Sequence, residues 1–233
     1  MPIKLVTSWS FSRYALYQTC PLKYKFTNID KLPEVKGPAL VRGSDIHDKA
    51  DRYLKGTIAR LPVELVKFKK LFAELRAVAK KTPGQIRLEE TWAFKADWTP
   101  TQWNDWAGCR LRIKTDATTI DKNVVTIYDW KTGKYRRDNA EGYAEQLELY
   151  GLGALVLFGA TVPKIEVRAR LVYLDVGEMH HSPTFTMSDL PELKKAWAQR
   201  VKPLMADTKF APKPNAFCNW CEWRVSNNGP CKY

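Results

Sequence analysis

The chain has 233 residues, a formal net charge of +13 from 38 Lys and Arg against 25 Asp and Glu, and 45% hydrophobic residues. This length and hydrophobic content can bury a core without disulfide staples, which excludes a disordered chain and a disulfide-rich scaffold. No apolar run reaches the roughly 18 residues of a membrane span, and residues 1–7 contain no secretory signal, so we expect a cytoplasmic protein with no membrane partner. The excess positive charge attracts polyanions, most often nucleic acid, although charge alone fits a soluble basic protein equally well.

The first third of the chain has helical patterns. Residues 8–18 predict a short helix rich in aromatic side chains, with Ser8 or Ser10 available as its cap. Apolar residues spaced by three or four predict a second helix over residues 38–54 and a third over residues 62–80.

The pattern then changes to that of strands. Alternating or β-branched stretches predict four strands, over residues 86–95, 109–120, 124–128 and 164–174. Residues 121–123 are expected to form a hairpin turn. A long helix is predicted over 140–158, and Ser188 is expected to cap a final helix over 189–205. This order of elements predicts a mixed α/β fold with a helical front end.

Three of the five cysteines lie near the end of the chain, after a proline-rich link. Cys218 and Cys221 form a Cys-x2-Cys pair, and Cys231 follows after nine intervening residues. Thiols in a chain without an export signal are more often ligands or buried residues than disulfide partners. Three clustered thiols need a fourth ligand to complete a metal site, and Cys20 and Cys109 are the candidates.

Two carboxylates predicted on neighbouring strands indicate a cation site. Asp129 and Lys131 are two residues apart at a strand end, so their side chains share one side, and the preceding strand carries Asp116. Two close carboxylates repel each other unless a divalent cation lies between them, and a nearby lysine can orient a metal-bound water. Taken alone, an Asp-x-Lys on a strand is more often a surface ion pair.

Six motifs occur in a fixed order along the chain. They are Ser8-Trp9-Ser10 to Tyr14 with Cys20-Pro21-Leu22-Lys23-Tyr24, then Gly43 to His47, Asp116, Tyr128-Asp129-Trp130-Lys131-Thr132-Gly133, the pair Gln146 and Tyr150, and Phe217-Cys218 with Cys221 and Cys231. Together they resemble the PD-(D/E)XK nuclease superfamily, in particular its RecB-type branch, which includes iron–sulfur exonucleases and CRISPR-associated adaptation nucleases. One departure is Ile113-Lys114-Thr115-Asp116, where the family commonly has Gly-Arg-Ile-Asp, so Asp121 is the alternative first acid.

The resemblance implies a restriction-endonuclease-like α/β fold, with a mixed central sheet flanked by helices. One nuclease domain is expected over 1–233, made of a helical part (1–84), a nuclease core (85–206) and a cysteine-rich tail (207–233) joined to Cys20 by a metal cluster.

The resemblance also implies roles for individual residues. Mg²⁺ or Mn²⁺ is expected to bind His47, Asp116, Asp129 and the backbone carbonyl of Trp130. The imidazole favours Mn²⁺, because it is softer than the oxygen ligands that Mg²⁺ prefers. The implied catalytic residues are Asp116, Asp129, Lys131, Gln146 and Tyr150, with Lys131 positioning the attacking water. Packing of a helix on the sheet explains Tyr150 equally well.

A [4Fe–4S] cluster is implied for Cys20, Cys218, Cys221 and Cys231, with a structural role, although four thiolates suit Zn²⁺ as well. Cys109 is then expected to be a buried strand residue.

Other residues have two interpretations each. Glu89 or Glu90 fits the surroundings of a metal, or a solvated strand edge; Lys134, Arg136 and Arg137 fit DNA binding, or a solvated turn. The chain has nine Trp and ten Tyr, and exposed ones beside basic residues are expected to stack on unpaired bases.

We therefore expect a divalent-metal-dependent DNA exonuclease that acts on single strands or DNA ends in recombination, repair or replication. Further expected partners are recombination proteins or a second copy of the chain. The alternative is a non-catalytic nucleic-acid-binding protein that retains the nuclease fold, and a redox protein is the third interpretation.

Overall fold

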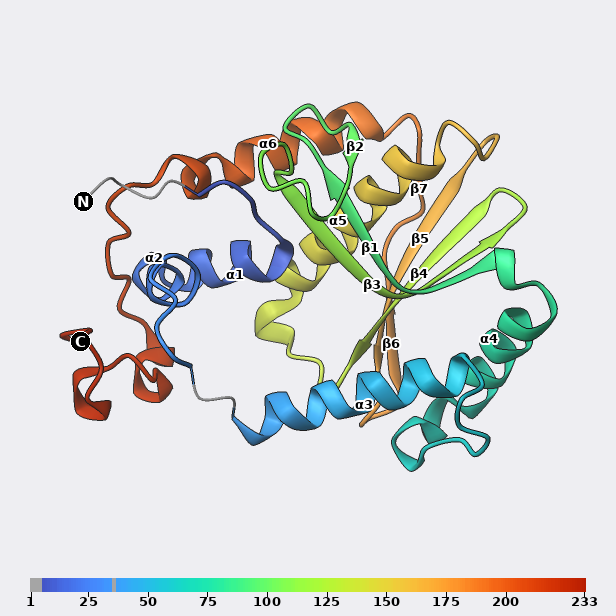
Figure 1. The fold of residues 1–233 in the computed structure, drawn as a ribbon, viewed down its shortest axis with the longest axis horizontal. Helices are drawn as coiled ribbons and strands as arrows, with labels where there is room; N and C mark the ends of the chain where they lie inside the picture. The colour runs from blue at the N-terminus through green and yellow to red at the C-terminus, as the bar shows by residue number, and fades with distance from the viewer. Residues whose placement is uncertain (1–5, 35–36) are drawn as a thin grey trace.

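The computed structural model describes residues 6–34 and 37–233 (Figure 1). Residues 1–5, which belong to the segment expected to lack an export signal, lie outside the described part. The strands are β1 Ile86–Phe94, β2 Pro100–Thr101, β3 Leu111–Asp121, β4 Val124–Lys131, β5 Glu166–Tyr173, β6 Glu178–His181 and β7 Phe185–Thr186. They form one sheet in the order β2-β1-β3-β4-β5-β6, with β7 pairing β5. All pairs are antiparallel except β4 and β5, which makes the sheet mixed.

The α-helices are α1 Phe11–Thr19, α2 Pro21–Tyr24, α3 Pro38–Leu54, α4 Lys69–Lys81, α5 Ala140–Phe158 and α6 Leu190–Ala206. A π-helix covers Lys25–Ile29, and 3₁₀ helices cover Val63–Phe68, Pro83–Gln85, Arg137–Asn139, Ala216–Trp220 and Val225–Asn227. Within the described residues, no helix combines the length and the apolar content that crossing a bilayer requires.

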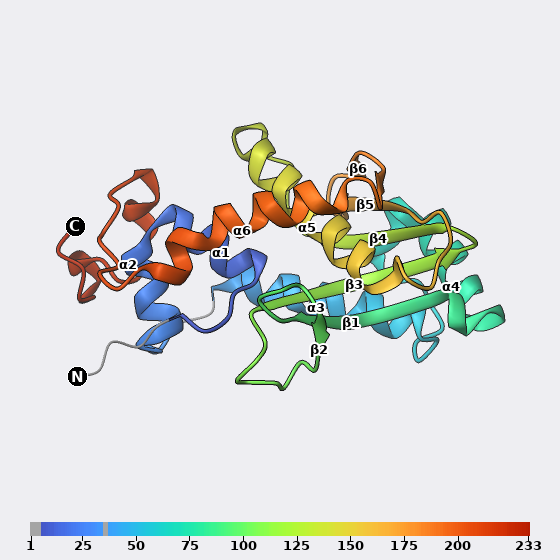
Figure 2. The same ribbon diagram turned by 90° about the horizontal axis from the view of Figure 1, so that it is seen from above.

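Helices cover both faces of the sheet (Figure 2). On one face, α1, α5 and α6 enclose a core that includes Ile127, Leu171 and the fully buried Trp197. On the other face, α3 and α4 enclose a second core, in which the ring centroids of Phe72 and Trp130 are 4.9 Å apart. Burial of these large apolar surfaces provides the main stabilisation of the layers. The predicted class, a mixed α/β fold with a central mixed sheet between helices, is confirmed.

The parallel pairing of β4 with β5 explains the long helix between them. Two parallel neighbours need a crossover connection, and α5 provides it. The carboxyl end of β4 is then free to open into a loop at Gly133, whose φ of +94° suits a residue without a Cβ.

Strands β1 and β3 twist near Glu89 and Asp116, so that side chains before and after this point switch faces of the sheet. In β1, Ile86 packs with the core under α3 and α4, whereas Trp92, also even-numbered, packs with the core under α5. A regular strand would keep both on one face. The rotation occurs near Glu89, which has a left-handed φ of 53°.

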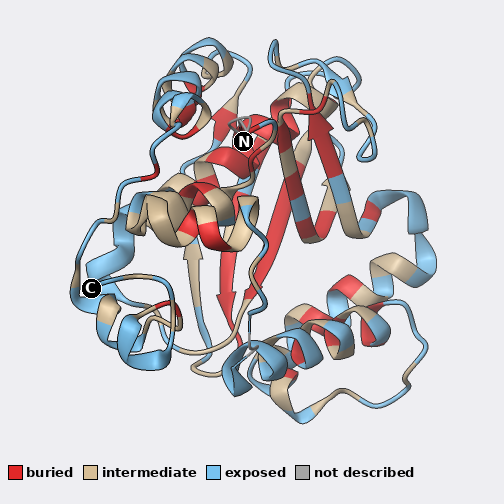
Figure 3. Cartoon of the chain, turned by 60° about the vertical axis from the view of Figure 1, so that its left-hand side comes forward, coloured by how far each residue is buried: buried red, intermediate tan, exposed pale blue. Residues whose placement is uncertain are grey.

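The cysteine-rich tail packs on the N-terminal helices through direct contacts. Asn215 Nδ2 donates to the carbonyl of Thr19 at 2.9 Å, and Lys23 pairs with Glu222 at 3.2 Å. The ring centroids of Phe26 and Trp223 are 5.9 Å apart. Most tail residues remain exposed or half-buried, in contrast to the buried sheet (Figure 3).

Several predicted boundaries were wrong. The predicted third helix is divided into a 3₁₀ helix and α4, because Phe68 has φ −114° and ψ 28° at their junction. Ser188 does not cap α6; Asp189 occupies the N-cap position. The short strands β2, β6 and β7 were not predicted, and Cys109 is buried but precedes β3.

Candidate active site

Three side chains from three elements form a group of potential metal ligands. His47 lies on α3, Asp116 on β3 and Glu89 on β1, and one ligand atom from each lies within 4.8 Å of the others. His47 Nδ1 is 2.9 Å from Asp116 Oδ1. Glu89 is opposite Asp116, because the neighbouring register pairs are Leu88 with Ala117 and Glu90 with Thr115.

A second chain of contacts starts from Asp129 on β4. Tyr150, from α5, donates its hydroxyl to Asp129 Oδ1 at 2.7 Å, and Gln146 Nε2 donates to the Tyr150 hydroxyl oxygen at 3.0 Å. Lys131 Nζ contacts Asp129 Oδ2 at 2.6 Å. The predicted pair Asp129 and Lys131 therefore shares one side of the strand.

A backbone hydrogen bond links the two groups. The N–H of Trp130, the residue after Asp129, donates to Asp116 Oδ2 at 2.6 Å. The pairing of β3 with β4 ends at Ala117 and Tyr128, so the strands separate where the two acids lie. The N–H and C=O of one strand residue point to the same edge of the strand, so the Trp130 carbonyl is directed to the β3 side of β4.

The electrostatics of the site favour a bound cation. Burial raises the pKa of Asp116, the hydrogen bond from His47 opposes this rise, and the charge of Asp129 adds to it. Burial disfavours a charged His47, but its hydrogen bond to Asp116 and the charges of Asp116, Asp129 and Glu89 outweigh burial and raise its pKa. Without a cation, a proton on His47 or Asp116 therefore offsets the negative charge of the neighbouring carboxylates, a charge that a bound cation would balance instead.

The donor set fits Mg²⁺ or Mn²⁺. Carboxylate oxygens are the ligands that both ions prefer, and the imidazole nitrogen of His47 suits Mn²⁺ better. Asp129 Oδ2 is buried and accepts no hydrogen bond apart from its contact with the Lys131 ammonium, within the residues that the structure describes.

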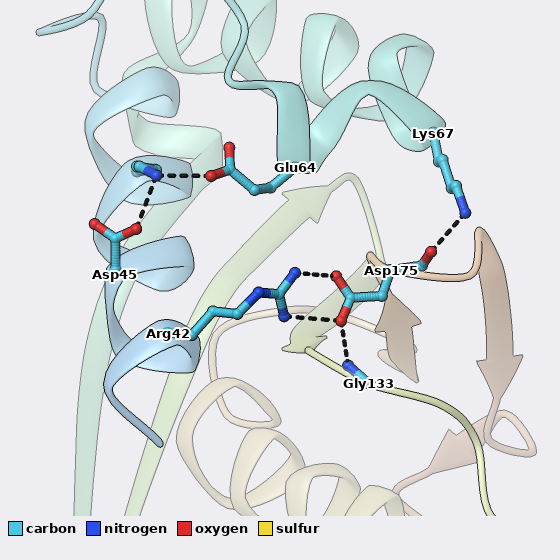
Figure 4. Close-up of polar contacts among 7 residues, drawn as sticks. Arg42, Asp45, Glu64, Lys67, Gly133 and Asp175 are labelled. Atoms are coloured by element: carbon cyan, nitrogen blue, oxygen red, sulfur yellow. Dashed lines mark hydrogen bonds and ion pairs between the residues drawn. The ribbon is translucent and has the colours of Figure 1, made fainter. Parts of the chain in front are cut away.

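A cluster of ion pairs holds α3 against the end of β4 (Figure 4). Arg42 contacts both carboxylate oxygens of Asp175 at 2.9 and 2.7 Å, and Asp175 Oδ2 also accepts from the Gly133 N–H at 2.7 Å. Gly43 allows the close approach, since a Cβ there would lie 3.3 Å from Thr132 Oγ1. The arrangement fixes the helix that carries His47 relative to the strand that carries Asp129.

No sequence pattern predicts the pairing of Arg42 with Asp175, because they are 133 residues apart and belong to no shared motif. Glu89 and Glu90 are equivalent candidates in the sequence. The structure separates them: Glu89 joins His47 and Asp116 and pairs with Lys114, whereas Glu90 accepts from Arg87 and from the Trp92 indole.

The remaining predicted residues lie around the site. Lys134, Arg136 and Arg137 are exposed in the segment between β4 and α5, where Arg136 pairs with Asp138 at 2.6 Å. Asp121, the alternative first acid, is exposed at the far end of β3.

The four cysteines predicted as cluster ligands, Cys20, Cys218, Cys221 and Cys231, line one cavity of about 340 Å³. All four thiols are free. Cys109 lies apart from them, buried, with its thiol directed to the carbonyl of Leu111 at 3.4 Å.

Comparison with known proteins identifies the family. Two solved structures are similar: SSO0001 (TM-score 0.49, 14% identity, 99% of this chain and 88% of that one) and a "Putative exonuclease" from Eubacterium rectale (TM-score 0.49, 14% identity, 93% and 87%). These likenesses are too distant to support an argument about function. No curated protein matches the chain. A sequence model of the PD-(D/E)XK nuclease superfamily, whose members use divalent metals, matches residues 8–226. The chain therefore belongs to the PD-(D/E)XK nuclease superfamily.

Proposed function

We propose that the protein is a divalent-metal-dependent DNA exonuclease of the RecB-type branch. It hydrolyses phosphodiester bonds in single-stranded DNA or at DNA ends, during recombination, repair or replication. The observation that supports this most strongly is the hydrogen bond from Trp130 N to Asp116 Oδ2, which joins the ligand group of His47 and Glu89 to the pair Asp129 and Lys131.

In this proposal the cation is held by His47, Glu89, Asp116, Asp129 and the Trp130 carbonyl. A bound divalent cation makes a coordinated water acidic and neutralises charge on the phosphate. The Lys131 ammonium supplies a fixed positive charge beside the reacting phosphate, which requires no reorganisation during the reaction. Tyr150 orients Asp129 through its 2.7 Å hydrogen bond, and Gln146 in turn orients Tyr150.

The proposed substrate follows from charge. The net charge of +13 favours a polyanion as the substrate. The exposed Lys134, Arg136 and Arg137 follow Lys131 directly after the end of β4. We propose that these three residues bind the phosphate backbone of DNA next to the site.

We also propose that Cys20, Cys218, Cys221 and Cys231 hold a [4Fe–4S] cluster. The shared cavity of about 340 Å³ supports a large group. Four thiolates suit a tetrahedral Zn²⁺ site as well, and the resemblance of the cysteine motif to that of iron–sulfur exonucleases is what favours the cluster. Its role is structural, because it fastens the tail to α2. Iron, sulfide and zinc analysis of anaerobically purified protein decides between the two.

The nuclease proposal is tested with an end-labelled single-stranded oligonucleotide and Mn²⁺. Asp129→Asn should lower the cleavage rate by about a hundredfold or more, because the substitution removes a charge that acts directly at the site. Asp121→Asn is the matched control, since this aspartate is exposed at the other end of the hairpin, and it should cleave at the wild-type rate. Equal rates for Asp129→Asn and wild type would disprove the proposal. Metal-independent binding without turnover would instead support the non-catalytic alternative.

A further inference from the structure

The segment between β1 and β3, residues 95–110, forms an ordered loop that we call the tryptophan loop. It contains the two residues of β2 and projects at the edge of the sheet (Figure 2). Asp105 accepts from the Thr101 hydroxyl at 2.7 Å and from the Gly108 N–H at 2.8 Å. Asp97 accepts from the Thr99 N–H and hydroxyl at 3.0 and 2.7 Å. These internal bonds hold the loop in one shape.

Two indoles of this loop face solvent. Trp103 is 39% exposed and Trp106 is 76% exposed. A tryptophan buried in a core stabilises the fold, whereas an indole held outward by an ordered loop leaves a large apolar surface in water. This arrangement therefore favours a binding role for the two side chains.

Arg112, on β3, holds the two indoles in place. Its guanidinium carbon lies 5.6 Å from the ring centroid of Trp103 and 4.9 Å from that of Trp106. Its Nε and Nη2 donate to the Trp103 carbonyl at 3.2 and 3.1 Å, and Nη1 donates to Ser8 Oγ at 2.7 Å. The positive charge beside the rings makes the surface complementary to a nucleotide, which combines an aromatic base with a phosphate.

The loop is continuous with the candidate active site. One cavity of about 340 Å³ is lined by Trp103 of the loop, by Arg112 and Lys114 on β3, and by Gln146 and Tyr150 on α5. Tyr150 is the residue that donates to Asp129. The lining residues include two cations and no carboxylate, so the cavity suits an anionic ligand.

We propose that Trp103 and Trp106 form a stacking platform for an unpaired base adjacent to the scissile phosphate, which makes single-stranded nucleic acid the substrate. This inference rests on the proposed nuclease function of the same site and specifies its substrate. A base in a duplex is already stacked and paired, so it cannot offer its face to an indole, whereas an unpaired base of any sequence can.

The platform is tested by fluorescence anisotropy in EDTA, so that binding is measured without turnover. The probes are a fluorescein-labelled thymidine 12-mer and a labelled duplex of equal length. Trp106→Ala should weaken binding of the 12-mer by about 5- to 150-fold, the effect of losing one base–aromatic stack. Binding of the duplex should not change. Trp106→Phe should recover most of the affinity, because it keeps an aromatic face.

Val63→Ala serves as the matched surface control. Val63 is 77% exposed and Trp106 is 76% exposed, but Val63 belongs to a 3₁₀ helix outside the tryptophan loop. This variant should bind the 12-mer as the wild type does.

The outcomes separate the two proposals. Equal binding of the 12-mer by wild type and Trp106→Ala, or no binding by the wild type, overturns the platform, whether or not DNA is cleaved. Selective loss in Trp106→Ala supports the platform even if the Asp129→Asn comparison shows no metal-dependent cleavage.

Discussion

The hydroxyl of Tyr150 provides a quantitative test of the site geometry. Tyr150 is 5% exposed, and burial followed by the charge of Asp129 raises its pKa well above the ordinary value, so it stays protonated and donates. Tyr150→Phe removes the 2.7 Å bond to Asp129 and leaves Gln146 Nε2 without its acceptor. A hydrogen bond to a charged group contributes about 1.5–3 kcal/mol, and an unpaired buried donor costs about 1 kcal/mol or more. We expect a loss of about 3 kcal/mol, which lowers the unfolding midpoint by about 6–12 °C for a chain of this size.

The matched control is Tyr24→Phe. Tyr24 is 2% exposed, and its hydroxyl forms no hydrogen bond among residues 6–34 and 37–233. The same chemical change should therefore alter the midpoint by less than about 2 °C, because no hydrogen bond is lost. Both variants are compared by circular dichroism during heating in EDTA. Equal losses for the two variants, or no loss for Tyr150→Phe, would refute the assigned role of the Tyr150 hydroxyl.

Two further predictions concern metal binding and packing. Because the pKa of His47 is raised, a proton on this residue stabilises the metal-free fold below the ordinary value of 6.5, and this contribution is lost as the pH rises through the raised value. A cation must displace that proton, so titration calorimetry should show tighter Mn²⁺ binding at pH 8 than at pH 6; a pH-independent affinity contradicts this assignment. Gly153→Ala should lower the free energy of unfolding in urea by about 1–3 kcal/mol, because the new Cβ would lie 2.8 Å from Ile113 Cδ1 and 3.1 Å from Trp92 Cε3. Gly84→Ala, where nothing lies within 4 Å, should show no comparable loss, and similar losses at both positions would argue against the close packing of α5 on the sheet.

The sequence predicts best those elements whose periodicity is long and regular. The expected helices over 38–54 and 140–158 agree with α3 and α5, because their apolar spacing continues over several turns. Strands β2, β6 and β7 have two to four residues each, so they carry no periodicity of their own and exist through pairing with β1 and β5. The predicted N-cap of α6, Ser188, lies one residue before the observed N-cap, Asp189, whose carboxylate accepts from the Thr186 N–H and makes no capping bond.

For the site, the motifs identified residues but not their grouping. Asp116 and His47 are 69 residues apart, and only the packing of α3 on the sheet brings them to 2.9 Å. Glu89 was one of two equivalent glutamates in the sequence. Its membership of the ligand group depends on the register of β1 with β3 and on its left-handed backbone, neither of which leaves a pattern in the sequence.

The contacts between the tail and the N-terminal helices have a consequence for biosynthesis. Thr19 and Asn215, which form one of these contacts, are 196 residues apart. The ribosome therefore makes α1 and α2 long before the tail residues that pack on them. Until then, the aromatic side chains of these helices lack part of their cover and are available to chaperones and proteases. Every His, Asp, Glu, Lys, Gln and Tyr assigned to the proposed nuclease site has been synthesised by residue 150. The groups of the proposed nuclease site are therefore synthesised before the tail that completes the packing around α1 and α2.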